Sequence, residues 1–338
     1  MFGADWIRFQ HYVRELSALC SSLVNCLLIF LVVTKSPKEL GAYKYLMICI
    51  SAYEILYSLL DVVVSPFFDS VGPAYMMLVI TRGKLLPHSA YLVLAAIYAG
   101  FFGLSMAFFA IHFIYRYLVA SRSPLLESFN SLKLFIWLAV PIFVGVSWAL
   151  VCIFLLKPSD YTISYVSLEV LRRYGMRMDD FVCFTAHFHE KVSNHKTVFH
   201  VTQFIGILIM SFYTVRHPDG KCMIQWYLQL ASLIIACSFS IKCYIRIRSV
   251  LITSTTSNKC QALQSQLFYA LVVQTAIPIV LMHIPAFLIL LLVALNIEAS
   301  AATRTFSMTV SLYTALDSIP VLLIVKPYRT ALAGTNGR

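Results

Sequence analysis

Ala110-Ile111-His112-Phe113-Ile114-Tyr115-Arg116-Tyr117 is the stretch that decides the fold of this chain. It closes a long apolar run that begins near Ser89, and Arg116 is the first Lys or Arg after Lys84. A single arginine where an apolar run of spanning length meets polar sequence is typical of a membrane helix that reaches the cytoplasmic face. Tyrosine favours the membrane–water interface. The stretch therefore predicts the inner end of a transmembrane helix.

The composition of the whole chain also indicates a membrane protein. Of its 338 residues 60% are hydrophobic and 12% are charged, which is too few charges to cover a soluble protein of this size. The net charge of +11 would suit a nucleic-acid-binding protein, but almost all Lys and Arg flank apolar segments. Loops beside anionic lipid have this pattern. We therefore expect membrane lipid as a partner and no nucleic acid.

Seven apolar segments reach or approach the ~20 residues that cross a bilayer. This pattern predicts an all-α membrane protein, a single seven-transmembrane helix bundle over residues 1–338. A further apolar segment, residues 197–215, is interpreted as part of an outer loop, because an eighth span would place Lys326 and Arg329 outside. The predicted helices cover approximately residues 13–34, 45–68, 89–120, 134–156, 225–247, 266–295 and 305–325.

The distribution of Lys and Arg predicts the orientation of the bundle. With the N-terminus outside, the inner segments hold thirteen of these residues and the short outer segments hold five. The long region between the fourth and fifth helices is left out of the count, because long loops cross largely regardless of charge. We therefore expect the N-terminus outside and the C-terminus inside. The five outer residues are Arg8, Arg14, Arg82, Lys84 and Arg304.

Short motifs follow one another in a distinctive order along nearly the whole chain. They are Ser36-Pro37-Lys38, Gly41-Ala42-Tyr43-Lys44-Tyr45-Leu46-Met47, then Glu54, Tyr57, Asp61 and Pro66, the HFIYRY stretch, Leu263-Gln264-Ser265-Gln266-Leu267-Phe268, Gln274-Thr275-Ala276-Ile277-Pro278, and finally Asp317, Pro320 and Tyr328-Arg329. In this order they resemble the nematode seven-transmembrane Str-type chemoreceptors (the serpentine receptor class r and seven TM receptor family, which is related to the diacetyl odorant receptor).

The function comes from this resemblance and not from spacing or composition. It implies a G protein-coupled chemosensory receptor of the odorant type, which detects a small molecule in the outer half of the bundle. It also implies coupling to a heterotrimeric G protein at the inner face and a place in the plasma membrane of chemosensory cilia. We expect no enzymatic activity, catalytic residue, metal or cofactor. The alternative that the residues leave open is a seven-span transporter or intramembrane enzyme of unknown substrate.

Arg116 is the first candidate for the switch that couples to the G protein. The resemblance favours this role, and the alternative is a simple interface anchor. Tyr115 stands where an acid would restrain the arginine, so any restraint must come from another helix. The predicted coupling residues are Arg116, Tyr115, Tyr117, Asp317, Pro320 and Tyr328.

Three acids lie away from the ends of the predicted helices: Glu54, Asp61 and Asp317. A carboxylate there costs ~2.5–3.5 kcal/mol on insertion scales, so it usually faces the interior of the bundle. Glu54 and Asp61 are seven residues apart and therefore share a helix face. For Asp317, a role in rearranging the last helix and static hydrogen bonding between helices are equally open.

The predicted ligand pocket lies in the outer halves of the helices and is aromatic, as an apolar odorant requires. Helix packing would explain most of its residues equally well. They are Asp61, Tyr98, Phe101, Phe102, Met106, Trp226, Phe287 and Tyr313.

His112 and His283 lie in apolar helices and are predicted to be hydrogen-bonded core residues, in preference to metal ligands. Pro278 and Pro285 each remove a helix hydrogen bond and predict a bend in the sixth helix.

Residues 183–203 form a His-rich block in the second outer loop that has almost no counterpart in the family pattern. We interpret it as a retained intron, in which case Cys183 is not a true partner for Cys222. Transcript reads that run continuously through the block would contradict this interpretation. No Cys lies between Cys49 and Cys152, so a disulfide between the third helix and the second outer loop cannot form.

Overall fold

The computed structural model describes residues 3–72, 74–158, 160–187, 191–192, 196–197, 234–235, 237–246, 249 and 258–334. Within these residues six helical segments are long and apolar enough to cross a membrane. The helical residues 237–246 fall within the predicted fifth span, most of which lies outside the described residues. The six segments are Asp5–Lys35, Tyr43–Val64, His88–Ala120, Leu134–Phe154, Gln261–Val293 and Ser300–Ile324.

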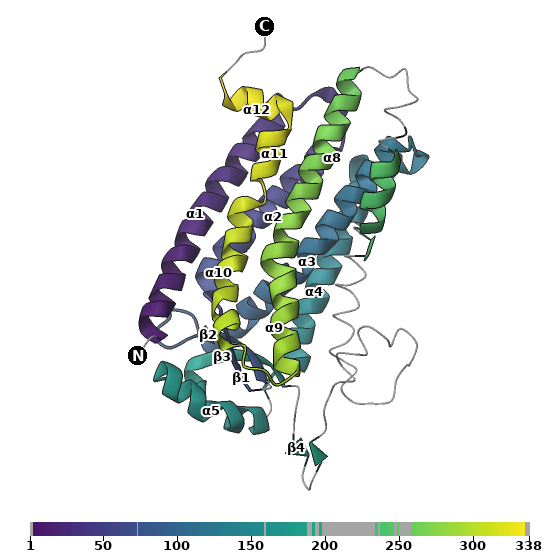
Figure 1. The fold of residues 1–338 in the computed structure, drawn as a ribbon. Helices are drawn as coiled ribbons and strands as arrows, with labels where there is room; N and C mark the ends of the chain where they lie inside the picture. The colour runs from purple at the N-terminus through teal and green to yellow at the C-terminus, as the bar shows by residue number, and fades with distance from the viewer. Residues whose placement is uncertain are drawn as a thin grey trace.

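The spanning helices run side by side along one axis (Figure 1). They are α1 (Gly3–Lys35), α2 (Tyr43–Val64), α3 (His88–Ala120), α4 (Leu134–Leu155), α8 (Asn258–Pro278), η6 (Ile279–His283), α9 (Ile284–Ala294), α10 (Ser300–Leu316) and α11 (Ile319–Ile324). A π-helical segment, η6, separates α8 from α9 directly after Pro278, at the place where the prolines predicted a bend.

Each end of the bundle carries its own short elements (Figure 1). The N-terminal end, where the chain begins, holds β1 (Phe67–Val71), β2 (Ala74–Ile80), α5 (Asp160–Tyr174), η4 (Met178–Asp180) and β3 (Phe181–His187). The C-terminal end, where the chain finishes, holds α12 (Lys326–Leu332). The remaining short elements are η1 (Lys38–Leu40), η2 (Pro124–Phe129), η3 (Ser131–Lys133), β4 (Lys191–Val192) and β5 (Lys196–Thr197).

The first helix begins earlier than the sequence predicted. It starts at Gly3 instead of residue 13. Arg14, which the charge count placed in the outer segment, therefore lies well inside α1 and is only 4% exposed. The prediction that Arg14 is an outer-loop charge is therefore wrong. Apolarity marks where a helix enters the hydrocarbon of the membrane. The helix itself begins earlier, in the polar residues that precede the apolar run.

The prediction of an all-α chain missed a three-stranded antiparallel sheet with the order β1-β2-β3. Helix α2 ends at Val64 because Ser65 precedes Pro66 and adopts a left-handed conformation (φ 51°, ψ 53°). The chain then continues into β1, so Phe67 belongs to a strand and not to the predicted second helix.

Helix α5 packs against this sheet across the N-terminal end of the bundle (Figure 1). Val166 and Val170 are fully buried on the sheet side, and they lie four residues apart and so share one helix face. They form a small core with Phe67, Leu78 and Phe181. We call this sheet and α5 together the cap.

Strand β3 includes the first five residues of the predicted insertion, Cys183 to His187. In the register of the sheet Cys183 pairs with Leu78 and His187 pairs with Ala74. Burial raises the pKa of the Cys183 thiol to about 12, so the thiol is unreactive. Cys222 lies outside the described residues. The retained-intron interpretation stays a prediction, but removal of the whole block would shorten β3 by these five residues.

Helices α3 and α4 cross closely because small residues line the crossing. A Cβ atom placed on Gly100 would lie 2.6 Å from the carbonyl oxygen of Gly145. A Cβ atom on Gly103 would lie 1.8 Å from Cδ1 of Trp148. Neither position can take a side chain unless the helices move apart.

We expect Gly103→Ala to destabilise the bundle by about 1–3 kcal/mol, because the added methyl group overlaps the indole ring of Trp148. The thermal midpoint of the detergent-solubilised protein, followed by fluorescence-detected gel filtration, measures this effect. Trp148→Leu combined with Gly103→Ala makes room for the methyl group and should recover part of the loss. A single variant as stable as the wild type would contradict the close crossing.

Candidate functional site

Arg116 is buried between three helices at the C-terminal end of the bundle, with 2% of its surface exposed. Its Nη1 donates a hydrogen bond to Oε1 of Gln264 on α8 at 2.7 Å. Its guanidinium carbon lies 3.5 Å from the centre of the Tyr43 ring on α2, in a cation–π contact. The restraint on Arg116 therefore comes from other helices, as the sequence required, and it is an amide and not an acid.

The guanidinium of Arg116 is only partly satisfied. Its Nε and Nη2 are buried and have no hydrogen-bond partner among the residues that the structure describes. A buried donor without a partner costs about 1–3 kcal/mol, and more when it is charged. A new hydrogen-bond acceptor at this end of the bundle could therefore bind these nitrogens and draw Arg116 away from Gln264.

The predicted tyrosines join neighbouring elements around Arg116. The Tyr115 hydroxyl donates to the carbonyl oxygen of Leu40 in η1 at 3.3 Å. Tyr117 meets the ring of Phe239 edge-on, with 5.6 Å between centroids. The Tyr328 hydroxyl on α12 lies 2.9 Å from Oγ of Ser36.

Asp317 and Pro320 lie where α10 gives way to α11. Gln274 on α8 donates from Nε2 to Oδ2 of Asp317 at 2.9 Å, and Pro320 is in the first turn of α11. The next residue, Ser318, has its Oγ 3.0 Å from Oε2 of Glu54 on α2 and 2.6 Å from Oδ1 of Asn25 on α1. Four helices therefore meet through polar side chains at this junction.

A small cavity lies between the Arg116 site and this junction. It is lined by Tyr43, His112 and Gln274 together with apolar side chains of four helices, and about 10 Å³ of it is open to the centre of a water molecule. His112 Nδ1 is 3.3 Å from the Tyr43 hydroxyl, and its Nε2 has no partner among the described residues. A cavity of this size accepts about one water. Polar groups thus extend from Arg116 through the cavity to Asp317.

The histidine predictions agree with these contacts. His112 meets Tyr43 as described, and Nε2 of His283 lies 3.5 Å from Oγ of Ser105. The His283 ring also packs edge-on against Phe102, with 4.9 Å between centroids. Within the described part of the chain no group of three or more His, Cys, Asp or Glu could hold a metal ion.

Three of the predicted pocket residues gather around Tyr57 of α2. The centre of the Tyr57 ring lies 5.1 Å from Tyr98, 5.6 Å from Phe101 and 6.4 Å from Tyr313. The hydroxyls of Tyr57, Tyr98 and Tyr313 are buried and lack a hydrogen-bond partner in the described structure. We call these four residues the aromatic cluster.

The other predicted pocket residues are distributed around this cluster or lie apart from it. Phe102 meets Trp148 and His283 edge-on, towards α4 and η6. Met106 is buried in the core. Phe287 on α9 is 40% exposed, so it is not part of the buried cluster. Trp226 lies outside the described residues.

Asp61 forms an ion pair that the sequence did not reveal. Its Oδ2 lies 3.2 Å from Nε of Arg14 on α1 and accepts a hydrogen bond from Ser311 on α10 at 2.5 Å. Arg14 also donates from Nη2 to the carbonyl oxygen of Pro66 at 2.7 Å. Both charged side chains are at most 5% exposed, so the pair is held inside the bundle.

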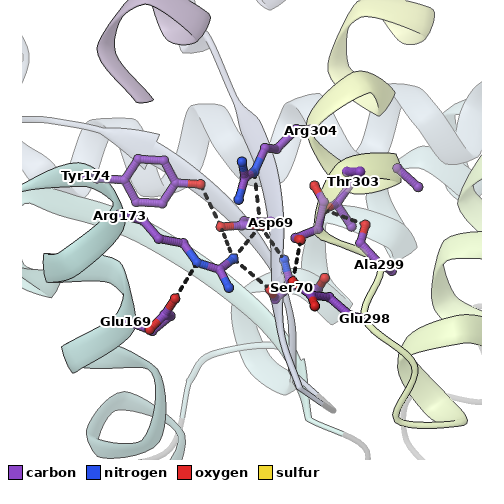
Figure 2. A network of polar contacts seen from close by, with 12 residues as sticks. Asp69, Ser70, Glu169, Arg173, Tyr174, Glu298, Ala299, Thr303 and Arg304 are labelled. Atoms are coloured by element: carbon purple, nitrogen blue, oxygen red, sulfur yellow. Dashed lines mark hydrogen bonds and ion pairs between the residues drawn. The ribbon is translucent and has the colours of Figure 1, made fainter. Parts of the chain in front are cut away.

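A second ionic network fastens the cap to the bundle (Figure 2). Asp69 of β1 is fully buried, and Nη1 of Arg173 on α5 donates to both of its carboxylate oxygens at 3.0 and 3.1 Å. The Tyr174 hydroxyl donates to Oδ2 at 2.6 Å, and Nε of Arg304 on α10 lies 3.8 Å from Oδ1. Burial and the Asp69 charge raise the pKa of Tyr174, and the hydrogen bond from Arg173 lowers that of Glu169.

Several residues of these sites escaped the sequence predictions. Each is a polar side chain inside an otherwise apolar helical run, which is the signal that could have found it. What the sequence does not contain is the choice of partner, because the partners lie on other helices. The residues are Arg14, Asn25, Gln264, Gln274, Ser311 and Ser318.

Known proteins match the chain along nearly its whole length. The family model described as "Serpentine type 7TM GPCR chemoreceptor Str" matches residues 10–218 and 219–333. "G-protein coupled receptor str-217" of Caenorhabditis elegans is 31% identical over 328 residues, which cover 96% of this chain and 89% of the relative. "Serpentine receptor class r-10" of the same nematode is 24% identical over 337 residues, covering 98% and 92%.

These matches include Arg116, the Asp317 junction and the aromatic cluster, so the described sites lie within the shared region. They also argue against the transporter and the intramembrane enzyme, because the relatives are named as receptors. The chain belongs to the Str family of serpentine seven-transmembrane chemoreceptors.

Proposed function

We propose that this chain is an odorant-type receptor of the plasma membrane of chemosensory cilia, which binds a small molecule and couples to a heterotrimeric G protein. The observation that carries the proposal is Arg116, which is buried and held to α8 by one hydrogen bond to Gln264. A buried charged side chain held by one hydrogen bond at the end of a bundle can be released when the helices move apart.

In this proposal the N-terminal end of the bundle is outside and the C-terminal end is inside. Support comes from the charge rule, which gave thirteen Lys and Arg inside and five outside. Arg14 is inside α1, and its removal from the outer count strengthens the asymmetry. The cap then faces the exterior, and Arg116 faces the cytoplasm.

The aromatic cluster is the part of the outer half that best suits a small ligand. Its rings offer apolar contact, and three hydroxyls without partners offer hydrogen bonds. We keep Asp61, Phe102, Met106, Trp226, Phe287 and Tyr313 as candidate neighbours of the ligand. Because Asp61 is already occupied by Arg14 and Ser311, its role there is to position helices.

The polar groups between the two ends provide a route for coupling. A ligand that moves α10 also moves Asp317, which is bonded to Gln274 of α8. A shift of α8 then changes the contact between Gln264 and Arg116. Arg116, once released, can present its guanidinium to the G protein, while Tyr115, Tyr117, Pro320 and Tyr328 shape the surface around it.

Calcium imaging of cells that express the chain with a reporter G protein tests the function. We expect at least one compound of a panel of volatile small molecules to evoke a response that disappears when the G protein is omitted. A form without residues 183–203 is measured in parallel, because the block is an interpreted intron. Receptor present at the cell surface and silent to a broad panel in both forms would contradict the proposal.

Lys84 provides a test of the orientation. It lies half-buried beside the cap and donates to the carbonyl oxygen of Val64 at 3.0 Å. Burial and the nearby Arg14 charge lower its pKa to about 8, so at pH 8 more of this amine is neutral and reactive than of an ordinary exposed lysine. A membrane-impermeant amine reagent at pH 8 should therefore acylate Lys84 in intact cells. Mass spectrometry identifies the labelled peptide, and Lys84→Arg is the control.

Lys38 and Lys326 belong to the opposite end of the bundle and are exposed. We expect the reagent to reach them only after the cells are permeabilised. Labelling of these two lysines in intact cells, with Lys84 protected, would reverse the proposed orientation.

A further inference from the structure

The three buried acids of the spanning segments, Glu54, Asp61 and Asp317, differ in how their charge is compensated. Asp61 has a cationic partner, Arg14. Glu54 and Asp317 are fully buried, and no Lys, Arg or His lies within ion-pair distance of either among the described residues. Buried charge without a counter-charge is so costly that such groups usually bind a proton or a cation instead.

The hydrogen bonds around Ser318 need more hydrogens than its hydroxyl can supply. Ser318 Oγ lies 2.6 Å from Oδ1 of Asn25 and 3.0 Å from Oε2 of Glu54. Asn25 turns its amide nitrogen towards the carbonyl oxygen of Ser21 at 3.1 Å, so its oxygen is the atom that faces Ser318. A serine hydroxyl has one proton, and both of these oxygens are acceptors when Glu54 is ionised. A proton on Glu54 would satisfy both contacts.

The remaining carboxylate oxygens show the same deficit. Asp317 uses Oδ2 to accept from Gln274, and Glu54 uses Oε2 towards Ser318. The other two oxygens, Oε1 of Glu54 and Oδ1 of Asp317, are buried without a hydrogen-bond partner. The two carboxyl groups lie within hydrogen-bonding reach of one another. Two ionised carboxylates would repel at this separation, whereas a carboxylic acid would donate to a carboxylate.

We propose that Glu54 and Asp317 form a proton-binding site in the middle of the bundle and hold at least one proton between them. A proton on Oε2 of Glu54 donates to Ser318, and a second proton, on Oε1 of Glu54 or Oδ1 of Asp317, donates to the other carboxyl group. One proton therefore satisfies one of these contacts, and two protons satisfy both. The site connects α2 to the junction of α10 and α11.

The described groups that surround the pair include no cationic side chain that could replace the proton as the source of positive charge. Helix α1 contributes the amide of Asn25 and α8 contributes the amide of Gln274. The titratable neighbours are Tyr53 of α2 and Tyr313 of α10, which carry no positive charge in either protonation state. The Tyr53 hydroxyl donates to the carbonyl oxygen of Phe101 at 2.8 Å.

Infrared spectroscopy of the purified full-length protein tests the site, because a protonated carboxyl has a carbonyl stretching band that a carboxylate lacks. We expect this band in the wild type, with a shift in D2O. It should weaken or vanish in Glu54→Gln and in Asp317→Asn, and it should be absent from the double variant. Each introduced amide supplies its own N–H donors, so the contacts persist without the proton. Glu39→Gln is the control and should keep the band, because Glu39 is exposed at the C-terminal end and its replacement leaves both carboxyl groups of the pair in place.

A second measurement separates a proton from a metal cation as the occupant. The thermal midpoint of the wild type is compared in NaCl, KCl and choline chloride at equal ionic strength. A bound proton predicts equal midpoints in the three salts. A midpoint that rises with Na⁺ or K⁺ in the wild type alone would show a metal cation in the site and overturn the proposal. A wild type without the carbonyl band, or a band that survives the double variant, would also overturn it.

Discussion

Replacement of Arg116 by alanine is expected to abolish the odorant-evoked calcium response while the amount of receptor at the cell surface stays at the wild-type level. The physical reason is the position of the guanidinium, which is buried at the C-terminal end with two nitrogens unsatisfied. A receptor without this guanidinium has no buried positive charge to present to the G protein when the helices move apart. It also loses a poorly satisfied buried charge, so its stability should change little.

Two variants serve as controls for this result. Lys38→Ala removes an exposed positive charge from the same end of the molecule and should respond normally. Arg116→Lys keeps the charge but loses the planar guanidinium that stacks on Tyr43, so we expect a weakened response. If Arg116→Ala responds like the wild type, Arg116 is only an interface anchor.

Gln264→Leu should have the opposite effect on basal signalling. The hydrogen bond from Arg116 to Gln264 is charge-assisted, and such bonds contribute about 1.5–3 kcal/mol. Its loss should raise the ratio of active to resting receptor on the order of tenfold or more. Reporter activity without odorant measures this ratio, and the double variant with Arg116→Ala should be silent.

Asp61→Ala is the second substitution with a large expected effect. It leaves Arg14 buried without its counter-charge, and removal of one member of a buried ion pair costs about 3–5 kcal/mol. Whole proteins are stable by only about 5–15 kcal/mol, so most of the receptor should fail to reach the surface. Flow cytometry of surface receptor and the thermal midpoint in detergent measure the loss.

The complete set of variants shows whether the two residues act as a pair. Arg14→Ala should be about as harmful as Asp61→Ala, whereas the double variant should be less harmful than the sum of the two, because no charge is left alone. Arg172→Ala breaks an exposed contact with Glu169 and should cost at most about 1 kcal/mol. Strictly additive losses at Arg14 and Asp61 would show that the two side chains do not interact.

The sequence was sufficient for the six spanning helices that the structure describes, because their length and apolarity follow directly from the thickness of a bilayer. The burial of Arg116 and Asp317 could also be anticipated, because charged residues in such helices usually face the interior. Family resemblance then supplied the function, which no pattern of apolar residues could have supplied.

The cap could not be predicted from the sequence, for a different reason. Residues 74–80 form a short apolar run, and such a run suits a buried strand or part of a helix equally well. The strand forms because residues 181–187 pair with it, about a hundred positions further along the chain. Helix α5 did leave a signal, since Thr162, Val166 and Val170 are buried at intervals of four residues.

The ion pair of Arg14 with Asp61 illustrates the limit for individual sites. The sequence contained both residues, but Arg14 stood at the start of the predicted first helix and was counted among the outer charges. The partners of Arg116 and Asp317 were hidden in the same way. Gln264 and Gln274 are ordinary polar residues until the packing of α8 against α3 and α11 brings them into contact.

The pairing of β2 with β3 joins the two long connections at the N-terminal end through backbone hydrogen bonds, and Cys183 within β3 is a free thiol. The chain has no Cys between Cys49 and Cys152, and the connections are joined by a ladder of backbone hydrogen bonds from Ala74 to Ile80. The formation of such a ladder does not depend on glutathione or on oxidising enzymes. We therefore expect the receptor to mature in a reducing cell-free translation mixture supplemented with lipid nanodiscs, where receptors that need a disulfide misfold.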